Sequence, residues 1–375
     1  MSPAARSGEP ECFAVVAGGG TAGHVLPAIA IMDRLVGAGH PAAGLHHVGT
    51  VRGIESRLLP PTGFASTRLD VVGLQRAFTW GNLMFVPKLL RATWHAWRLL
   101  GRLRPRVVVN VGGYASMPAT FAAFLRRCPV VVVSYDQRPG LASKVSARFA
   151  TATAAAFPDS PLPRARTTGA PIRREVIAVD RDAQRAEARA ELGLPGDRFV
   201  ITVFGGSLGA KALNTAVTGL VERWRDRGDV CIHHVVGERW VGEMPPPRWP
   251  SEGIMYRVIG YEDRMPLLFA ASDLMVTRAG ASTIAELAAT GMPAIVVPWP
   301  DAAENHQLDN ARSLTDRGAA VLLEQHELDT DRLAALVEEL RADSGRLPEM
   351  SRLARVEGER HRGDSLIRLI EEAAR

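Results

Sequence analysis

The chain has 375 residues, of which 46% are hydrophobic and 23% are charged, and its formal net charge is +5. This composition is typical of a globular protein long enough for two domains, each with its own core. The positive excess is too small to predict nucleic-acid binding, but it is compatible with an anionic membrane surface or a phosphorylated substrate. Cys12, Cys128 and Cys231 show no metal-ligand spacing and fit a reducing cytosol. The sequence contains no run of about 18 apolar residues, so no bilayer-spanning helix is predicted.

Residues 1–11 are small and polar and lack the apolar core of a signal peptide, so they are expected to form a flexible tail. The apolar run 13–17 predicts a strand, a glycine turn follows at 18–24, and helical spacing of apolar residues predicts a helix over 25–36. The turn has the spacing neither of a dinucleotide fingerprint nor of a P-loop. His24 ends the turn, where both a structural and a functional role are open.

The rest of the first half alternates predicted strands and helices, which is typical of a parallel sheet. A second glycine turn, 112–116, leads into a helix with Ser116 as the expected N-cap and Pro118 in its first turn. Polar residues at 134–140 follow a strand and either contact a ligand or form a turn. The expected strands are 45–48, 64–72, 107–111, 129–133 and 151–156, and the proline-rich stretch 158–171 is interpreted as an interdomain connection.

One segment, residues 78–106, interleaves aromatic and apolar residues with lysine and arginine. A basic amphipathic helix with aromatic residues at its edge is suited to an interfacial membrane contact. The alternative is a core helix with a solvated basic face. The expected membrane patch comprises Trp80, Leu83, Phe85, Lys88, Arg91, Trp94 and Trp97.

The second half repeats the arrangement of strand, glycine loop and helix, with a strand ending at 204 and a loop at 205–210. A further small-residue turn, 278–283, lies between an apolar strand and a helix that ends at Gly291, which predicts a left-handed C-cap. Free N–H groups and the helix dipole make such a turn an anion site. Glu286, one helical turn further on, is either an ordinary surface residue or a ligand for a diol. The other expected strands are 230–235, 256–259, 273–276, 294–298 and 319–323.

Two doubly wound α/β lobes with phosphate-type turns suggest a nucleotide-binding cleft between domains. No spacing indicates a metal site, and no Ser/His/Asp order or reactive cysteine indicates a hydrolase. The simplest interpretation is an enzyme that binds a phosphorylated donor in one lobe and an acceptor in the other.

Five motifs in this order resemble the MurG family of peptidoglycan N-acetylglucosaminyltransferases. They are residues 19–27, 112–116, 169–173, 205–210, and 278–283 with Glu286. The resemblance covers nearly the whole chain and implies the GT-B fold, in which two Rossmann-like doubly wound lobes form an interdomain cleft. We therefore expect an acceptor and membrane-facing lobe at 12–170, a UDP-sugar donor lobe at 171–345, and C-terminal helices at 346–375 that pack back across the N-terminal lobe.

Members of that family transfer N-acetylglucosamine from UDP-GlcNAc to undecaprenyl-pyrophosphoryl-muramyl-pentapeptide (lipid I), which gives lipid II. The new linkage is β, so the reaction inverts the anomeric centre, and the resemblance implies neither a metal nor a cofactor. It implies a peripheral enzyme on the cytoplasmic face of the cell membrane. The implied partners are a UDP-sugar, a polyprenyl-pyrophosphate lipid acceptor and an anionic membrane surface, with no nucleic acid.

The resemblance also implies roles for individual residues. His24 would be the catalytic base near the acceptor hydroxyl. Arg173 and Ser207 would contact the donor diphosphate, Glu286 the ribose, and Gln307 with His306 the sugar hydroxyls. The full donor-binding set is Thr21, Gly23, Arg173, Ser207, Ile259, Ala281, Ser282, Thr283, Glu286, His306 and Gln307, and the uracil would lie against residues 256–264. The acceptor-side set is Tyr114, Ser116, Tyr135 and Asp136.

The chain departs from the family at one stretch on the acceptor side. The family commonly carries His-Glu-x-Asn before Pro-Gly-Leu-Ala, whereas residues 133–136 here read Val-Ser-Tyr-Asp before an intact 139–142. A MurG-like transferase that uses another polyprenyl or phosphoglycolipid acceptor, as in moenomycin-type antibiotic assembly, is therefore an alternative. A nucleotide-sugar-binding protein without turnover and an epimerase relative on the same fold are two further alternatives.

Overall fold

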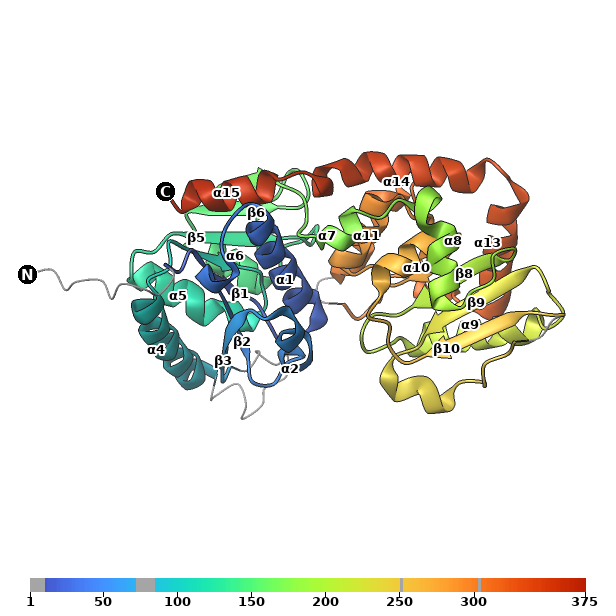
Figure 1. Ribbon diagram of the computed structural model, residues 1–375, viewed down its shortest axis with the longest axis horizontal. Coiled ribbons are helices and arrows are strands. Elements are labelled where there is room, and N and C mark those ends of the chain that lie inside the picture. Colours follow the sequence, from blue (N-terminus) through green and yellow to red (C-terminus); the bar gives the residue numbers. More distant parts are fainter. Residues whose placement is uncertain (1–10, 72–84, 250–251, 303–304) are drawn as a thin grey trace, which may run out of the picture. The chain divides into compact units, whose positions relative to one another are not determined.

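The computed structural model describes residues 11–71, 85–249, 252–302 and 305–375 (Figure 1). The chain divides into two compact units. The first unit comprises Met1–Arg174 and Gly363–Arg375, and the second unit comprises Glu175–Arg362. Each unit is built around a sheet whose paired strands run parallel.

The first unit contains a seven-stranded sheet in the order β3-β2-β1-β4-β5-β6-β7. Its strands are short and largely buried, as expected when helices cover a parallel sheet. They are β1 (Ala14–Ala17), β2 (Leu45–Thr50), β3 (Ala65–Leu69), β4 (Val107–Asn110), β5 (Val130–Ser134), β6 (Ala152–Ala155) and β7 (Ala165–Thr167). Its helices are α1 (Ala22–Gly37), α2 (Glu55–Leu58), α4 (Phe85–Leu103), α5 (Met117–Leu125), α6 (Leu141–Ala147) and α15 (Ser365–Ala373).

The second unit contains a six-stranded sheet in the order β10-β9-β8-β11-β12-β13. Its strands are β8 (Phe199–Phe204), β9 (Val230–Val235), β10 (Met255–Ile259), β11 (Leu274–Thr277), β12 (Ala294–Val296) and β13 (Val321–Leu322). Its helices are α8 (Arg181–Leu192), α9 (Lys211–Arg223), α10 (Met265–Ala271), α11 (Ala281–Thr290), α12 (His306–Thr315), α13 (Thr330–Ala342) and α14 (Arg346–Arg362), and α7 (Arg174–Ile177) begins at the last residue of the first unit.

In each sheet the first strand along the chain lies inside the sheet, and the strand order reverses beside it. The reversal falls between β1 and β4 in the first unit and between β8 and β11 in the second. Open parallel sheets bind ligands in the crevice at the carboxyl ends of the strands at such a switch point. The prediction of two doubly wound α/β units is confirmed, and all four glycine or small-residue turns of the sequence follow the strands that flank the two switch points.

Two segments differ from their predicted structure. The stretch 158–171, interpreted as a connection, contains β7, which pairs with β6 and extends the first sheet. The helices after residue 345 divide between the units: α14 packs on α11 in the second unit, whereas α15 packs near β4, β5 and β6 in the first. An ion pair between Arg34 and Asp364 (3.0 Å) ties the start of α15 to α1.

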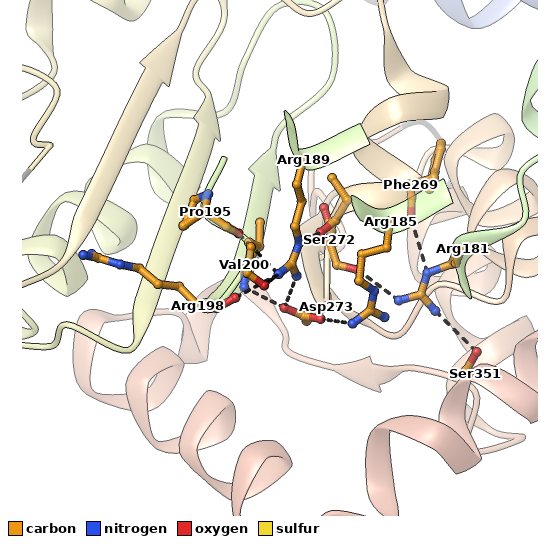
Figure 2. A network of polar contacts seen from close by, with 12 residues as sticks. Arg181, Arg185, Arg189, Pro195, Arg198, Val200, Phe269, Ser272, Asp273 and Ser351 are labelled. Carbon is orange, nitrogen blue, oxygen red and sulfur yellow. Dashed lines mark hydrogen bonds and ion pairs between the residues drawn. The ribbon is translucent and has the colours of Figure 1, made fainter. Parts of the chain in front are cut away.

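At the amino ends of the strands, the second unit is held by an arginine network in which Arg181 and Arg189 are buried (Figure 2). Asp273 accepts from Arg185 (2.8 Å), Arg189 (2.7 Å) and the Val200 backbone N–H (2.7 Å). Arg181 donates to the carbonyls of Phe269, Ser272 and Gly291. Burial lowers the pKa of Arg181 to about 10. These bonds fix α8 to the amino ends of the strands, whereas the switch-point turns follow their carboxyl ends.

Candidate functional site

A buried carboxylate holds the glycine turn that follows β1. Glu55, on α2, is fully buried, and its Oε1 accepts from the backbone N–H of Gly20 (2.9 Å) and of Thr50 (2.7 Å). A β-carbon at Gly19 or Gly53 would overlap this carboxylate, so glycine is required at both positions. Glu55 therefore sets the path of the backbone immediately before His24, a role that no local sequence pattern predicts.

The turn after β4 is organised by two further buried polar side chains. Asn110 accepts from the Gly112 N–H (2.8 Å) and donates to Thr120 (2.7 Å). Ser116 occupies the N-cap position of α5, as predicted, but makes no side-chain capping bond. It is fully buried and donates to the Gly113 carbonyl (2.8 Å) instead, so it shapes the turn.

His24 lies at the start of α1, against the turn after β4. Gly112 and Gly113 have φ of +89° and +74°, and a β-carbon at Gly113 would lie only 2.9 Å from His24 Cδ2. The imidazole Nδ1 lies 2.6 Å from the hydroxyl of Tyr135, which follows β5. That hydroxyl also lies 2.6 Å from the Gly23 carbonyl and 3.1 Å from the Val111 carbonyl. Three segments thus converge on the imidazole.

The environment of His24 favours a neutral imidazole. Burial lowers its pKa, while the Asp136 carboxylate, the Val111 carbonyl and Glu55 oppose that shift more weakly. Burial and the same Asp136 carboxylate raise the pKa of Tyr135, so its phenol keeps its proton. Among the described residues, no protein atom hydrogen-bonds His24 Nε2. A neutral imidazole with an unengaged nitrogen is suited to accept a proton.

Thr21, Gly23, Tyr114 and Asp136 lie on the same three segments of the chain as this centre. Thr21 is the N-cap residue of α1, and its carbonyl accepts from the His24 and Val25 N–H groups. Thr21 and Gly23 are exposed, and Tyr114 and Asp136 are partly exposed. The structure brings Gly23, His24 and Tyr135 into direct contact, with Asp136 adjacent in the chain.

In the second unit, the loop after β8 is a tight glycine turn. Gly206 and Gly209 have φ of +88° and +69°, and the Gly209 N–H donates to the Gly206 carbonyl (2.9 Å). A β-carbon at Gly209 would overlap the Val236 carbonyl. Ser207 is partly exposed at this turn, where its hydroxyl and backbone can meet a ligand.

The amino end of α11 forms the second turn at this switch point. Gly280 is its N-cap residue, no side chain caps the helix, and its first turn carries no acidic residue. The backbone N–H groups of Ala281, Ser282 and Thr283 therefore lack an intrahelical acceptor and form the positive end of the helix dipole. Glu286 lies one turn further along and is partly buried. The predicted left-handed C-cap at Gly291 is confirmed, with φ of +63°.

Helix α12 anchors the turn that precedes α11. Gln307 Oε1 accepts from the N–H groups of Ala279 (3.2 Å) and Trp299 (3.0 Å), and Asn310 donates to the Ala279 carbonyl (3.2 Å). The amide oxygen of Gln307 is therefore engaged in holding this turn. His306 is partly exposed at the start of α12. Asn310 was not predicted as a site residue.

Ile259 and Arg173, also predicted to bind the donor, lie outside the turns described so far. Ile259 ends β10, is partly exposed, and accepts from the Val236 N–H (2.9 Å). Arg173, expected in the donor lobe, belongs to the first unit, one residue before α7. The predicted donor-binding residues are thus contributed by both units.

Helix α4 has two apolar faces. One packs in the core of the first unit through Ala92, Ala96, Leu99 and Leu100. The other is exposed and carries Val86, Leu90, Trp94 and Trp97, whose relative exposures are 57%, 66%, 51% and 41%. Lys88 and Arg91 lie beside it. Of the predicted patch, Trp80, Leu83 and the Phe85 side chain lie outside the described residues.

No group of three or more His, Cys, Asp and Glu side chains in the described ranges could hold a metal ion. None of the described helices has the length and hydrophobicity needed to span a bilayer. Two parallel sheets, each with glycine or small-residue turns at its switch point, have the architecture expected of the GT-B fold.

Comparison with known proteins identifies the class and then the family. Residues 14–155 match the glycosyltransferase family 28 N-terminal domain and residues 200–363 its C-terminal domain. The chain is therefore a family 28 glycosyltransferase. It belongs, within that class, to the MurG family of N-acetylglucosamine transferases, as the following relatives show, and the predicted resemblance is confirmed.

Two relatives and one solved structure illustrate this. The UDP-N-acetylglucosamine–N-acetylmuramyl-(pentapeptide) pyrophosphoryl-undecaprenol N-acetylglucosamine transferase of Nocardioides sp. is 40% identical over 357 residues, 95% of this chain and 96% of the relative. The Streptomyces coelicolor enzyme of that name is 39% identical over 360 residues, 96% of this chain and 97% of the relative. Acinetobacter baumannii MurG superposes with a TM-score of 0.72 at 26% identity, over 97% of this chain and 99% of that one.

Proposed function

We propose that this enzyme transfers N-acetylglucosamine from UDP-GlcNAc to the polyprenyl-pyrophosphate-linked muramyl-pentapeptide, converting lipid I to lipid II. The relatives named for this reaction match the chain over nearly its full length. The observation that carries the proposal is that one chain combines a neutral histidine at the first switch point with an uncapped helix N-terminus at the second.

The proposed reaction is an inverting displacement at the anomeric carbon. His24 takes the proton of the acceptor hydroxyl as its oxygen bonds to that carbon, and the bond to the UDP oxygen breaks with its electron pair. The N–H groups of Ala281, Ser282 and Thr283 stabilise the charge that develops on the diphosphate. Arg173 and Ser207 add donors, and Glu286 accepts from the ribose diol. The proposed mechanism uses no metal or cofactor.

The membrane-facing part of the proposal rests on α4. Its exposed stripe of Val86, Leu90, Trp94 and Trp97 is apolar, and the Arg98 guanidinium lies 5.0 Å from the Trp94 ring. Phe124 and Leu125 are also exposed, at the end of α5, which packs against α4. An apolar stripe flanked by cations favours binding to anionic lipid. We propose that it docks the enzyme peripherally on the cytoplasmic face of the membrane, where a lipid-linked acceptor lies.

The direct test supplies purified enzyme with UDP-GlcNAc and lipid I and measures lipid II. Parallel reactions replace the donor by UDP-glucose or the acceptor by a phosphoglycolipid precursor. Product from lipid I with UDP-GlcNAc supports the proposal. Turnover only with the phosphoglycolipid would reassign the acceptor, and UDP-GlcNAc binding without turnover on either acceptor would indicate a binding protein.

Membrane docking is tested with vesicles that contain anionic or only neutral phospholipids. We expect a Leu90→Ala/Trp94→Ala variant to bind anionic vesicles about tenfold more weakly, because two apolar side chains that would insert into the bilayer are removed. The control is Trp249→Ala, since Trp249 is equally exposed on the second unit (51%). Equal vesicle binding by the α4 variant and the control would contradict this role for α4.

A further inference from the structure

The hydroxyl of Tyr135 has more neighbours than it has protons. It lies 2.6 Å from His24 Nδ1, 2.6 Å from the Gly23 carbonyl and 3.1 Å from the Val111 carbonyl. The Tyr135 side chain is almost fully buried, with 6% relative exposure. The protons in these short contacts must therefore come from the hydroxyl itself or from His24, because the two carbonyls only accept.

Proton accounting gives one consistent assignment. A phenol carries one proton and two lone pairs, whereas a carbonyl oxygen only accepts. If Tyr135 donated to Nδ1, two carbonyl oxygens would face its lone pairs without a proton between them. The hydroxyl therefore donates to a carbonyl and accepts from His24, so that Nδ1 carries the imidazole proton.

On this basis we infer that Tyr135 is a positioning residue that holds His24 in the Nδ1–H tautomer, so that Nε2 carries the lone pair that acts as the base. This inference rests on the proposed function for its catalytic meaning. Among the described residues no protein atom competes for Nε2, whose edge of the ring lies against the Gly113 turn. In the reaction Nε2 gains the acceptor proton, and the resulting imidazolium later releases it to solvent.

The charged groups around the ring fit this assignment. Asp136, next to Tyr135 in the chain, and Glu55 on α2 are the carboxylates that act on His24. Both stabilise the imidazolium that forms after proton uptake, while burial keeps the resting imidazole neutral. Tyr135 itself stays protonated and thus remains a fixed hydrogen-bond partner over the working pH range.

The first experiment reads the tautomer without any activity measurement. Nitrogen-15 NMR of histidine-labelled full-length enzyme distinguishes protonated from unprotonated ring nitrogens, and a His24→Gln variant identifies the His24 signals. We expect Nδ1 to be protonated and Nε2 unprotonated in the wild type, and a mixture of tautomers in Tyr135→Phe, which keeps the ring and removes the hydroxyl. A wild-type Nε2–H tautomer, or unchanged signals in Tyr135→Phe, would overturn the inference.

The second experiment links the tautomer to turnover. Tyr135→Phe is expected to lower kcat by about ten- to a hundredfold with the KM for UDP-GlcNAc unchanged, since general-base catalysis contributes about 10²- to 10⁴-fold. The double variant His24→Ala/Tyr135→Phe should be no slower than His24→Ala alone. Additive losses would mean that Tyr135 acts independently of His24. If no acceptor is turned over, the proposed function fails while the NMR result still decides the tautomer.

Discussion

A histidine–tyrosine pair of nearly the same geometry occurs in each unit of the molecule. The ring centroids are 6.2 Å apart at 58° in His24–Tyr135 and 6.1 Å apart at 53° in His234–Tyr256, and Nδ1 faces the phenol oxygen in both. Their hydrogen-bond networks differ. Near His24, the Tyr135 hydroxyl has two carbonyl oxygens within hydrogen-bond distance and donates its one proton to a carbonyl, whereas the Tyr256 hydroxyl has no such carbonyl partner within the described ranges.

The network around His234 assigns the opposite tautomer. Asn214 uses its NH₂ group to donate to the Val236 carbonyl (3.1 Å), so its oxygen faces His234 Nε2 (3.2 Å) and must accept a proton from it. Nδ1 then accepts from Tyr256. Both nitrogens of His234 are engaged and the side chain is fully buried. We call the His234–Tyr256 pair closed, because both imidazole nitrogens are hydrogen-bonded in the core. We call the His24–Tyr135 pair open, because only Nδ1 is hydrogen-bonded and Nε2 is left to act as a base.

The largest expected effect comes from removing the open base. His24→Ala should lower kcat by about 10²- to 10⁴-fold, because the acceptor hydroxyl loses its proton acceptor. UDP binding, measured by calorimetry, should not change. His40→Ala is the matched control, since His40 pairs with Glu371 in the same unit (3.0 Å). Wild-type turnover in His24→Ala would remove the functional difference between the two pairs.

The next largest effect is expected in UDP binding, which we assign to the second unit, whereas proton transfer is assigned to the first. Glu286→Ala should weaken UDP binding by more than about tenfold, which corresponds to about 1.5–3 kcal/mol for charged hydrogen bonds to the ribose. Glu327→Ala, an exposed carboxylate elsewhere in the unit, is the control. A dissociation constant that is unchanged in Glu286→Ala would refute the ribose assignment.

A change in the His234–Tyr256 pair should alter the free energy of unfolding and its pH dependence, and not the rate of turnover. Burial lowers the pKa of His234 from 6.5 to about 3. At a pH between these two values, His234 is therefore protonated in the unfolded chain and neutral in the folded chain. This residue therefore reduces stability by about 1.4 kcal/mol for each pH unit as the pH falls through that window. Urea unfolding of His234→Asn should show a shallower loss between pH 6.5 and 4.5.

The control for that slope is His95→Asn, because His95 is exposed on α4. Its unfolding free energy should follow the pH dependence of the wild type. If His234→Asn also follows the wild type, then His234 is not held neutral by the core, and the contrast between a closed and an open pair is wrong in the second unit.

The sequence allowed the elements of this comparison to be predicted, but not their contacts. Apolar runs and glycine turns predict both sheets and place His24 at a turn, because these signals are local. β7 was missed since Ala165–Thr167 has no buried apolar run. Glu55 lies 35 residues from Gly20, and Tyr135 lies 111 residues from His24. Such contacts depend on which strands become neighbours, and no local pattern encodes them.

Tyr256→Phe is the smallest change and the matched counterpart of Tyr135→Phe. It removes one neutral hydrogen bond (3.1 Å) from the core, which should cost about 0.5–1.5 kcal/mol of unfolding free energy. Because Tyr256 is fully buried and both nitrogens of His234 are engaged, kcat should stay at the wild-type value. A kcat loss as large as that of Tyr135→Phe would mean that any loosened core slows turnover. Unchanged kcat would mean that the orientation of the hydrogen bond, and not the presence of a histidine–tyrosine pair, separates the two units.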